Sequence, residues 1–103
     1  MTPVPHAIRF DSNTGMLHVD GRAVPLTGIE KRIVSLLFER LGKPITHQEI
    51  RTKAWGEGWS GGDEALRVAI NRLRKKIEGN QRKPEIIMSV RGVGYRMVGY
   101  LPQ

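Results

Sequence analysis

The sequence predicts an α+β fold with short antiparallel strands first, three helices next and a β-hairpin last. Three observations support this prediction. Short β-prone segments separated by turn residues occupy the first 26 positions. Apolar residues then recur at helical spacing in three segments, two of which open with a capping pattern. Near the end, two further β-prone segments flank a turn with two glycines.

Length and composition indicate one globular domain over residues 1–103, with a core from about residue 7 to residue 98. With 39% hydrophobic and 26% charged residues, the chain lies outside the disordered class. No apolar run approaches the ~18–20 residues that cross a bilayer, and the N-terminus lacks a secretory signal pattern. The absence of cysteine excludes disulfides and thiolate chemistry. We therefore expect a cytoplasmic protein.

The first 26 residues are expected to form a small antiparallel meander. Its strands are expected at residues 7–10, 16–19 and 23–26. Asn13-Thr14-Gly15 and Asp20-Gly21 separate them, and Asp-Gly is a strong hairpin signal. Pro25 cannot donate a ladder hydrogen bond, which places it near an edge or a strand end.

Two capped helices follow. Thr27-Gly28-Ile29-Glu30 is a capping box, and Gly42 stops the first helix. The inward face of that helix is predicted at Ile29, Ile33, Leu36, Leu37 and Leu41. A second capping box is expected at Thr46-His47-Gln48-Glu49, opening a short helix that ends by Gly56. This helix turns Ile50, Ala54 and Trp55 inward.

A third helix is expected from Glu64 to about Glu78, after a glycine-rich loop at 56–62. Its buried stripe is predicted at Leu66, Ile70, Leu73 and Ile77. The closing hairpin pairs 86–90 with 95–98 around Arg91-Gly92-Val93-Gly94. Two capped helices, a basic amphipathic helix and a trailing hairpin are typical of a winged helix-turn-helix.

Positive charge is concentrated in the second part of the chain. The net charge is +7, and residues 64–103 carry nine Lys/Arg against three Asp/Glu. A field of this sign attracts a polyanion, either a nucleic acid or an acidic membrane surface. The alternative is that the excess charge serves only solubility.

The third helix has an outward face suited to reading bases. At about 100° per residue, four side chains lie away from the apolar stripe. They are Val68, Asn71, Arg72 and Lys75. Arginine can form a pair of hydrogen bonds with guanine, and asparagine can do so with adenine. A methyl-bearing side chain can contact the thymine methyl group. Arg67, Arg74 and Lys76, on the shoulders, suit phosphates. The alternative is an ordinary solvated face, which would usually interleave acidic partners; residues 67–77 contain none.

The hairpin adds Arg91 and Arg96 on either side of its turn. Arginines on a slender ribbon can enter a minor groove. The alternative is a plain surface hairpin.

Six sequence segments together resemble one known family. They are Leu26-Thr27-x-x-Glu30, Leu36-Leu37, Thr46-x-x-Glu49-Ile50, Trp55-Gly56, Ile70-x-Arg72-Leu73-Arg74-Lys75-Lys76-Ile77 and Val90-Arg91-Gly92-Val93-Gly94-Tyr95-Arg96. In order and spacing they resemble the effector domain of OmpR/PhoB-type transcriptional regulators, response regulators of two-component systems. The resemblance runs from about residue 7 to residue 98.

The resemblance implies a winged helix behind an N-terminal sheet, with residues 64–78 as recognition helix and the hairpin around Gly92 as wing. Val68, Asn71 and Arg72 fall where members touch bases. Trp55 falls where a family tryptophan lies near the phosphate backbone, and Thr46 joins the expected phosphate contacts. The loop with Glu57 and Trp59 corresponds to a segment that contacts RNA polymerase in some members. Members typically bind direct repeats as head-to-tail pairs.

The chain departs from the family pattern at the start of the recognition helix. Members often have Arg-Thr-Val-Asp-Val-His there, where this chain has residues 64–69 as Glu-Ala-Leu-Arg-Val-Ala. Glu64 and Arg67 form a candidate reversed-sign pair, Ala69 replaces a phosphate-touching histidine, and Lys31 replaces a frequent aromatic residue. No operator sequence is therefore transferred from a relative.

Other motifs do not indicate chemistry. Gly56-x-Gly58-x-x-Gly61 follows a helix rather than a strand, so it is not a dinucleotide fingerprint. His6, His18 and His47 lack ligand-like spacing, and no base-and-orienter arrangement accompanies any serine. We expect no metal, no cofactor and no enzyme activity.

The sequence thus predicts specific binding of double-stranded DNA in bacterial transcription regulation. RNA polymerase and a second, head-to-tail copy are further expected partners, and the chain has no membrane segment. Two alternatives stay open: a winged helix that binds an acidic protein partner, and a non-specific nucleic-acid binder.

Overall fold

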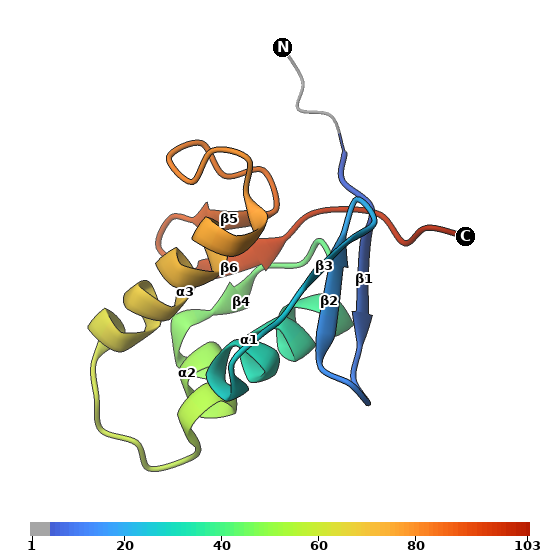
Figure 1. Cartoon of the computed structure of the whole chain (residues 1–103). Helices are drawn as coiled ribbons and strands as arrows, with labels where there is room; N and C mark the ends of the chain where they lie inside the picture. The colour runs from blue at the N-terminus through green and yellow to red at the C-terminus, as the bar shows by residue number, and fades with distance from the viewer. Residues whose placement is uncertain (1–4) are drawn as a thin grey trace.

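A computed structural model of the chain describes residues 5–103 (Figure 1). Three strands come first: β1 (Ile8–Asp11), β2 (Met16–Val19) and β3 (Arg22–Val24). A helical segment with one short strand follows: α1 (Gly28–Glu39), β4 (Ile45–Thr46), α2 (His47–Trp55) and α3 (Asp63–Ile77). The chain ends with β5 (Ile87–Val90) and β6 (Gly94–Met97). Apart from β4, this is the predicted α+β order, with boundaries shifted by one or two residues.

The first sheet is an antiparallel meander in the order β1-β2-β3. Asp20 and Gly21 link β2 to β3 and both have positive φ, 51° and 82°, as a two-residue turn of type I′ requires. β3 is an edge strand and ends at Val24, earlier than predicted, and Pro25 follows the strand end.

The capping box of α1 forms in both directions. The Thr27 hydroxyl accepts from the Glu30 N–H at 3.3 Å, and the Glu30 carboxylate accepts from the Thr27 N–H at 2.9 Å. The helix ends at Glu39, and Gly42 follows with a φ of +86°. Its predicted inward face packs in the core, although Ile29 and Leu41 are only partly buried.

The second predicted capping box forms only in one direction. Thr46 accepts a hydrogen bond from the Glu49 N–H at 3.1 Å. The Glu49 carboxylate does not return to Thr46 but pairs with Arg40 from the end of α1, at 2.6 Å. A cation from the preceding helix thus replaces the backbone N–H as its partner. Ile50 and Ala54 are buried as predicted.

The second sheet has the order β4-β6-β5 and contains a strand that was not predicted. β4 is only two residues long and pairs Ile45 with Tyr95 and Thr46 with Gly94. At Gly94 a Cβ would overlap the Ile45 carbonyl, so the close approach of β4 requires glycine there. The predicted hairpin is therefore the outer part of a three-stranded sheet.

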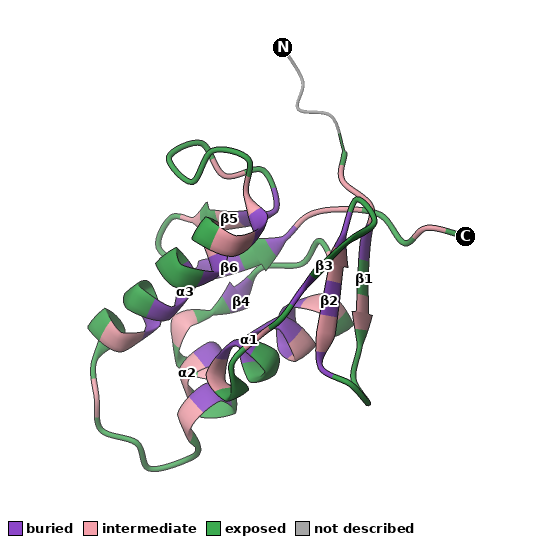
Figure 2. Cartoon of the chain, in the orientation of Figure 1, coloured by how far each residue is buried: buried purple, intermediate pink, exposed green. Residues whose placement is uncertain are grey.

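A single cluster of buried side chains joins both sheets and the helices (Figure 2). The predicted stripe of α3 belongs to it, since Leu66, Ile70 and Leu73 are fully buried and Ile77 almost so.

A backbone hydrogen bond connects the first strand to the segment after the last one. The Ile8 N–H donates to the Tyr100 carbonyl at 2.9 Å. None of the helices in residues 5–103 has the length and apolar character that crossing a membrane requires.

Candidate nucleic-acid interface

The face of α3 opposite its buried stripe is open to solvent. Val68 is 38% exposed, although the helix is anchored in the core on its other side. Asn71, Arg72 and Lys75 are exposed on the same side, and Figure 2 shows buried and exposed segments alternating along this helix. The residues predicted to read bases are therefore brought together on one accessible surface.

This surface is positively charged and lacks neutralising partners. Within residues 5–103, no carboxylate pairs with Arg72 or Lys75. The acidic residues on either side of it in sequence have other partners: at the start of α3, Asp63 pairs with Arg51 and Glu64 pairs with Arg67 at 3.1 Å, and after its end Glu78 accepts hydrogen bonds from backbone N–H groups. The reversed-sign pair suggested by the sequence therefore forms, and it leaves the centre of the helix free for an anion.

Arg74 does not lie on the open surface. Its guanidinium donates to the carbonyl of Ile87, with Nη2 at 2.8 Å and Nε at 3.1 Å, and to the hydroxyl of Ser89 at 3.1 Å. Its Cζ lies 5.6 Å from the centre of the Tyr95 ring. The residue was predicted as a phosphate contact, but its donors are used to hold α3 against the β5–β6 hairpin.

Lys76 is likewise bound to groups of the protein itself, although its side chain is only partly buried. Its Nζ donates to the Glu30 carboxylate at 2.6 Å and to the Pro25 carbonyl at 3.2 Å. Glu30 is only 3% exposed. Burial alone would raise the pKa of Glu30, but hydrogen bonds from Lys76 and from the Thr27 N–H outweigh it and lower the pKa below its ordinary value. Lys76 thus compensates a buried charge of α1.

The hairpin presents its arginines to solvent beside α3. Arg91 and Arg96 are exposed, and within residues 5–103 neither forms an ion pair. Gly92, between β5 and β6, has a φ of +77°, a conformation that favours glycine. The backbone N–H of His47, at the start of α2, donates to the Val93 carbonyl at 3.1 Å and so connects the turn to the helices. The hairpin therefore carries two free cations on an anchored turn.

Comparisons with known proteins identify the family. A sequence model described as "Transcriptional regulatory protein, C terminal" matches residues 21–97. The chain belongs to this family. It is an effector domain of the OmpR/PhoB type, as the resemblance in its sequence implies.

Individual relatives agree with this identification. The probable transcriptional regulator ycf27 of Cyanophora paradoxa is 31% identical over 90 residues, covering 85% of this chain and 38% of that protein. The chain thus spans about two fifths of the length of the curated relatives it matches.

Two solved structures share the fold. DrrB of Thermotoga maritima, an OmpR/PhoB homolog, has a TM-score of 0.78 at 26% identity, covering 89% of this chain and 42% of that one. The DNA-binding domain of Klebsiella pneumoniae RstA, solved in complex with the RstA box, has a TM-score of 0.77 at 26% identity, covering 93% and 95%.

The loop between α2 and α3 of this effector domain displays an aromatic pair. Trp55 is half-buried at the end of α2, and Trp59, 37% exposed, stacks on it with ring centres 4.7 Å apart. Gly61 lies against the Trp59 ring, where a Cβ would collide with it. Trp55 was predicted to point into the core, but its ring is shared between the core and this loop. Glu57 is exposed in the same loop.

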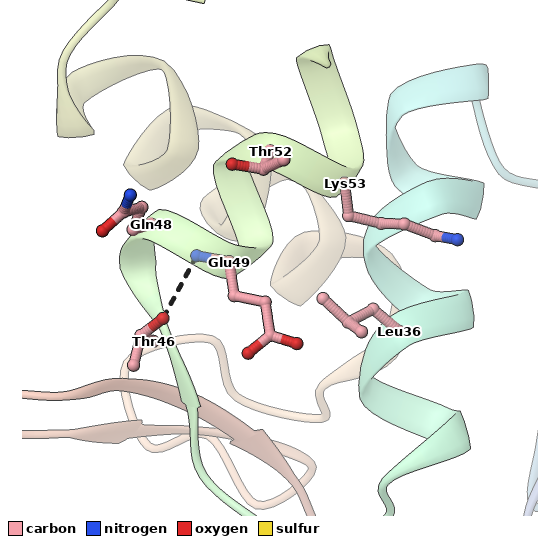
Figure 3. Close-up of a pocket in the computed structure, with 6 residues that line it drawn as sticks. All are labelled: Leu36, Thr46, Gln48, Glu49, Thr52 and Lys53. Atoms are coloured by element: carbon pink, nitrogen blue, oxygen red, sulfur yellow. Dashed lines mark hydrogen bonds between the residues drawn. The ribbon is translucent and has the colours of Figure 1, made fainter. Parts of the chain in front are cut away.

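Thr46 lies at the junction of β4 and α2, next to a shallow groove (Figure 3). The groove is lined by Leu36, Thr46, Gln48, Glu49, Thr52 and Lys53. Figure 3 shows the hydrogen bond from the Glu49 N–H to Thr46, and the Glu49 carboxylate on the side of α1. Because the Thr46 hydroxyl oxygen is used as an acceptor, its O–H stays available to donate to an external anion.

The sequence interpretation did not place two polar residues that adjoin the α3 surface. Gln81 and Arg82, between α3 and β5, line a groove together with Asn71 and Lys75. Arg82 contributes to the positive charge of this region, but its local sequence pattern does not indicate which surface it faces. Its position depends on how the connection folds back over the end of α3.

Proposed function

We propose that this effector domain binds double-stranded DNA at specific sequences and thereby regulates transcription. Its α3 lies in the major groove, and its β5–β6 hairpin reaches into the neighbouring minor groove. The observation that carries the proposal is the exposed, uncompensated face of α3, formed by Val68, Asn71, Arg72 and Lys75. An apolar group, an amide and two cations on one helix face match the chemistry of base edges.

We assign the DNA contacts according to where each side chain lies. The four α3 residues just named read bases. Thr46, Trp55 and Arg67 contact phosphates, and Arg91, Gly92 and Arg96 make the wing contacts. Arg67 can reach a phosphate despite its pairing with Glu64, because its side chain is 63% exposed. Arg74 and Lys76 support binding by positioning α3, because their donors already have partners within the protein. The protein acts by binding rather than by catalysis.

Further partners follow from the family. We propose that a second copy binds head-to-tail on a direct repeat, and that RNA polymerase contacts the loop with Glu57 and Trp59. The exposed Trp59 supports this second contact, since an exposed tryptophan often marks an interface. The site of action is the cytoplasm, where bacterial DNA is found.

Selection of bound sequences from random duplexes tests the proposal. We expect a defined motif, repeated in one direction, that binds about 1,000-fold or more tightly than a scrambled duplex. Affinity should fall steeply with salt, because phosphate contacts release counterions. A ratio near one would indicate a sequence-blind binder. Binding to an acidic protein in preference to any duplex would overturn the proposal.

A further inference from the structure

The connection between α3 and β5 adds a cation to the outward surface of α3. Gln81 and Arg82 share a groove of about 300 Å³ with Asn71 and Lys75. Both are exposed, and within residues 5–103 no hydrogen bond or ion pair engages the Arg82 guanidinium. Two amides and two cations from separate segments therefore line one groove.

The backbone of this connection is held on both sides of Arg82. The Glu78 carboxylate accepts hydrogen bonds from the N–H groups of residues 85, 86 and 87, at 2.8 to 3.1 Å. The Asn80 side chain accepts from the Arg82 N–H, and its carbonyl accepts from the Lys83 N–H, both at 3.0 Å. Because the backbone is already ordered, a ligand that binds Arg82 needs to immobilise little more than one side chain.

Nearby carboxylates do not compete for Arg82. The oxygens of Glu78 are occupied by backbone N–H groups. The Glu85 carboxylate accepts a hydrogen bond from His6 at 2.8 Å. The groove therefore offers donors to an external anion, and a phosphodiester, with two free oxygens, matches the fork of a guanidinium.

This inference rests on the proposed function. We propose that Gln81 and Arg82 form a third DNA-contacting element. The element binds a backbone phosphate beside the part of the major groove that Asn71 and Lys75 face. This element acts in addition to α3 and the wing. Because phosphates carry no sequence information, it contributes affinity and orientation rather than base discrimination.

The test compares Arg82→Ala with Lys83→Ala, which removes the same charge from the same connection but does not line the groove. We expect Arg82→Ala to weaken binding roughly 3- to 10-fold on selected and scrambled duplexes alike, and to lower the salt slope by about one. Lys83→Ala should change both quantities less. Phosphate ethylation interference should lose one position in Arg82→Ala, and Arg82→Lys should recover part of the affinity. Circular dichroism checks that all variants fold.

Two negative outcomes are distinguishable. If Arg82→Ala and Lys83→Ala have equal affinities and salt slopes while wild type still discriminates its selected site, this inference fails and the proposed function stands. If wild type binds no duplex under any salt condition, both fail.

Discussion

At the scale of single residues, Arg72 and Arg74 show how rotation around a helix divides similar side chains. They are two positions apart on α3, a rotation of about 200°, and so leave the helix on opposite sides. Arg72 is exposed on the proposed base-reading face. Arg74 is bound to Ile87, Ser89 and Tyr95 of the second sheet. The same residue type is therefore expected to have different effects when substituted.

Substitution of Arg72 by alanine should impair discrimination. We expect a loss of about 1–3 kcal/mol on the selected site, or roughly 5- to 150-fold in affinity, with tolerance for other bases at one position. The free energy of unfolding should hardly change, because the side chain is exposed. Fluorescence anisotropy on the selected site and its single-base variants measures the effect. Equal losses on every duplex would instead identify Arg72 as a phosphate contact.

Substitution of Arg74 should destabilise the protein as well as weaken binding. Arg74→Ala removes three donor contacts between α3 and β5, and we expect a loss of about 1–3 kcal/mol in the free energy of unfolding. Arg74→Lys keeps the charge but cannot reproduce the fork, so it should recover little of the stability. Urea unfolding and duplex binding are measured in parallel. Full recovery of binding by lysine, without recovery of stability, would support a direct phosphate contact.

At the scale of elements, the angle between α1 and α3 is held by polar contacts as well as by core packing. Glu30, in the first turn of α1, caps its own helix and accepts a hydrogen bond from Lys76 at the end of α3. Arg22 of β3 donates to the Lys76 carbonyl at 2.9 Å. Three elements thus meet at the C-terminal end of the proposed recognition helix, and a change there should alter how that helix is presented.

Acid should weaken this junction. The pKa of Glu30 is lower in the folded protein than its ordinary value of 4.5. Its ion pair therefore stabilises the fold above about pH 4.5, and the contribution is lost as the pH falls through the lowered pKa. Urea unfolding of wild type and Glu30→Gln across this range should show a stability difference that shrinks with acidification. A difference independent of pH would show that the charge of Glu30 does not stabilise the fold.

Removing the ammonium group of Lys76 should destabilise the protein more at neutral pH than in acid, because Glu30 is charged at neutral pH. Lys76→Met keeps an apolar stem of similar length but leaves the buried carboxylate of Glu30 without its strongest partner. We expect a loss of about 1–3 kcal/mol in the free energy of unfolding. Lys75→Met, which changes an exposed lysine next to it, serves as the matched control and should be nearly neutral. Equal stabilities of the two variants would contradict the role given to Lys76.

At the scale of the whole molecule, His6 joins segments that are far apart in the chain. Its Nδ1 lies 2.6 Å from the Asp20 carboxylate, at the β2–β3 turn, and its Nε2 lies 2.8 Å from Glu85, before β5. Hydrogen bonds to Asp20 and then to Glu85 raise the pKa of His6 above its ordinary value of 6.5. The N-terminal sheet is thereby linked to the connection that carries Arg82.

The bridge should make stability depend on pH near neutrality. Because the pKa of His6 is raised on folding, the protonated bridge contributes fully below about pH 6.5, and the contribution is lost as the pH rises through the raised pKa. Thermal unfolding of wild type and His6→Gln between pH 5.5 and about pH 9 measures the stability that the bridge contributes. This range includes the pH values at which His titrates. The wild-type advantage should be largest at the acidic end. An advantage that grows with pH would exclude a charged bridge.

Local sequence patterns are sufficient for most of the elements. The capping residues of α1, the apolar period of α3 and the Asp20-Gly21 turn act over at most a few neighbouring residues, and each forms where the pattern predicts it. The exposed face of α3 follows from the same period, because the placement of one buried stripe leaves the opposite side to solvent.

The remaining features depend on residues that are distant in the chain. Three of them use a group that another element supplies. β4 pairs with β6, Glu49 pairs with Arg40, and Arg74 donates to the Ile87 carbonyl. Arg82 lines the α3 groove in a connection that hydrogen bonds to Glu78 and Asn80 hold in place. Helical period and turn chemistry describe which way a side chain leaves its own segment. Which donor or acceptor it meets there is set by packing, since the free energy of a polar contact depends on the group that the rest of the fold brings within about 3 Å.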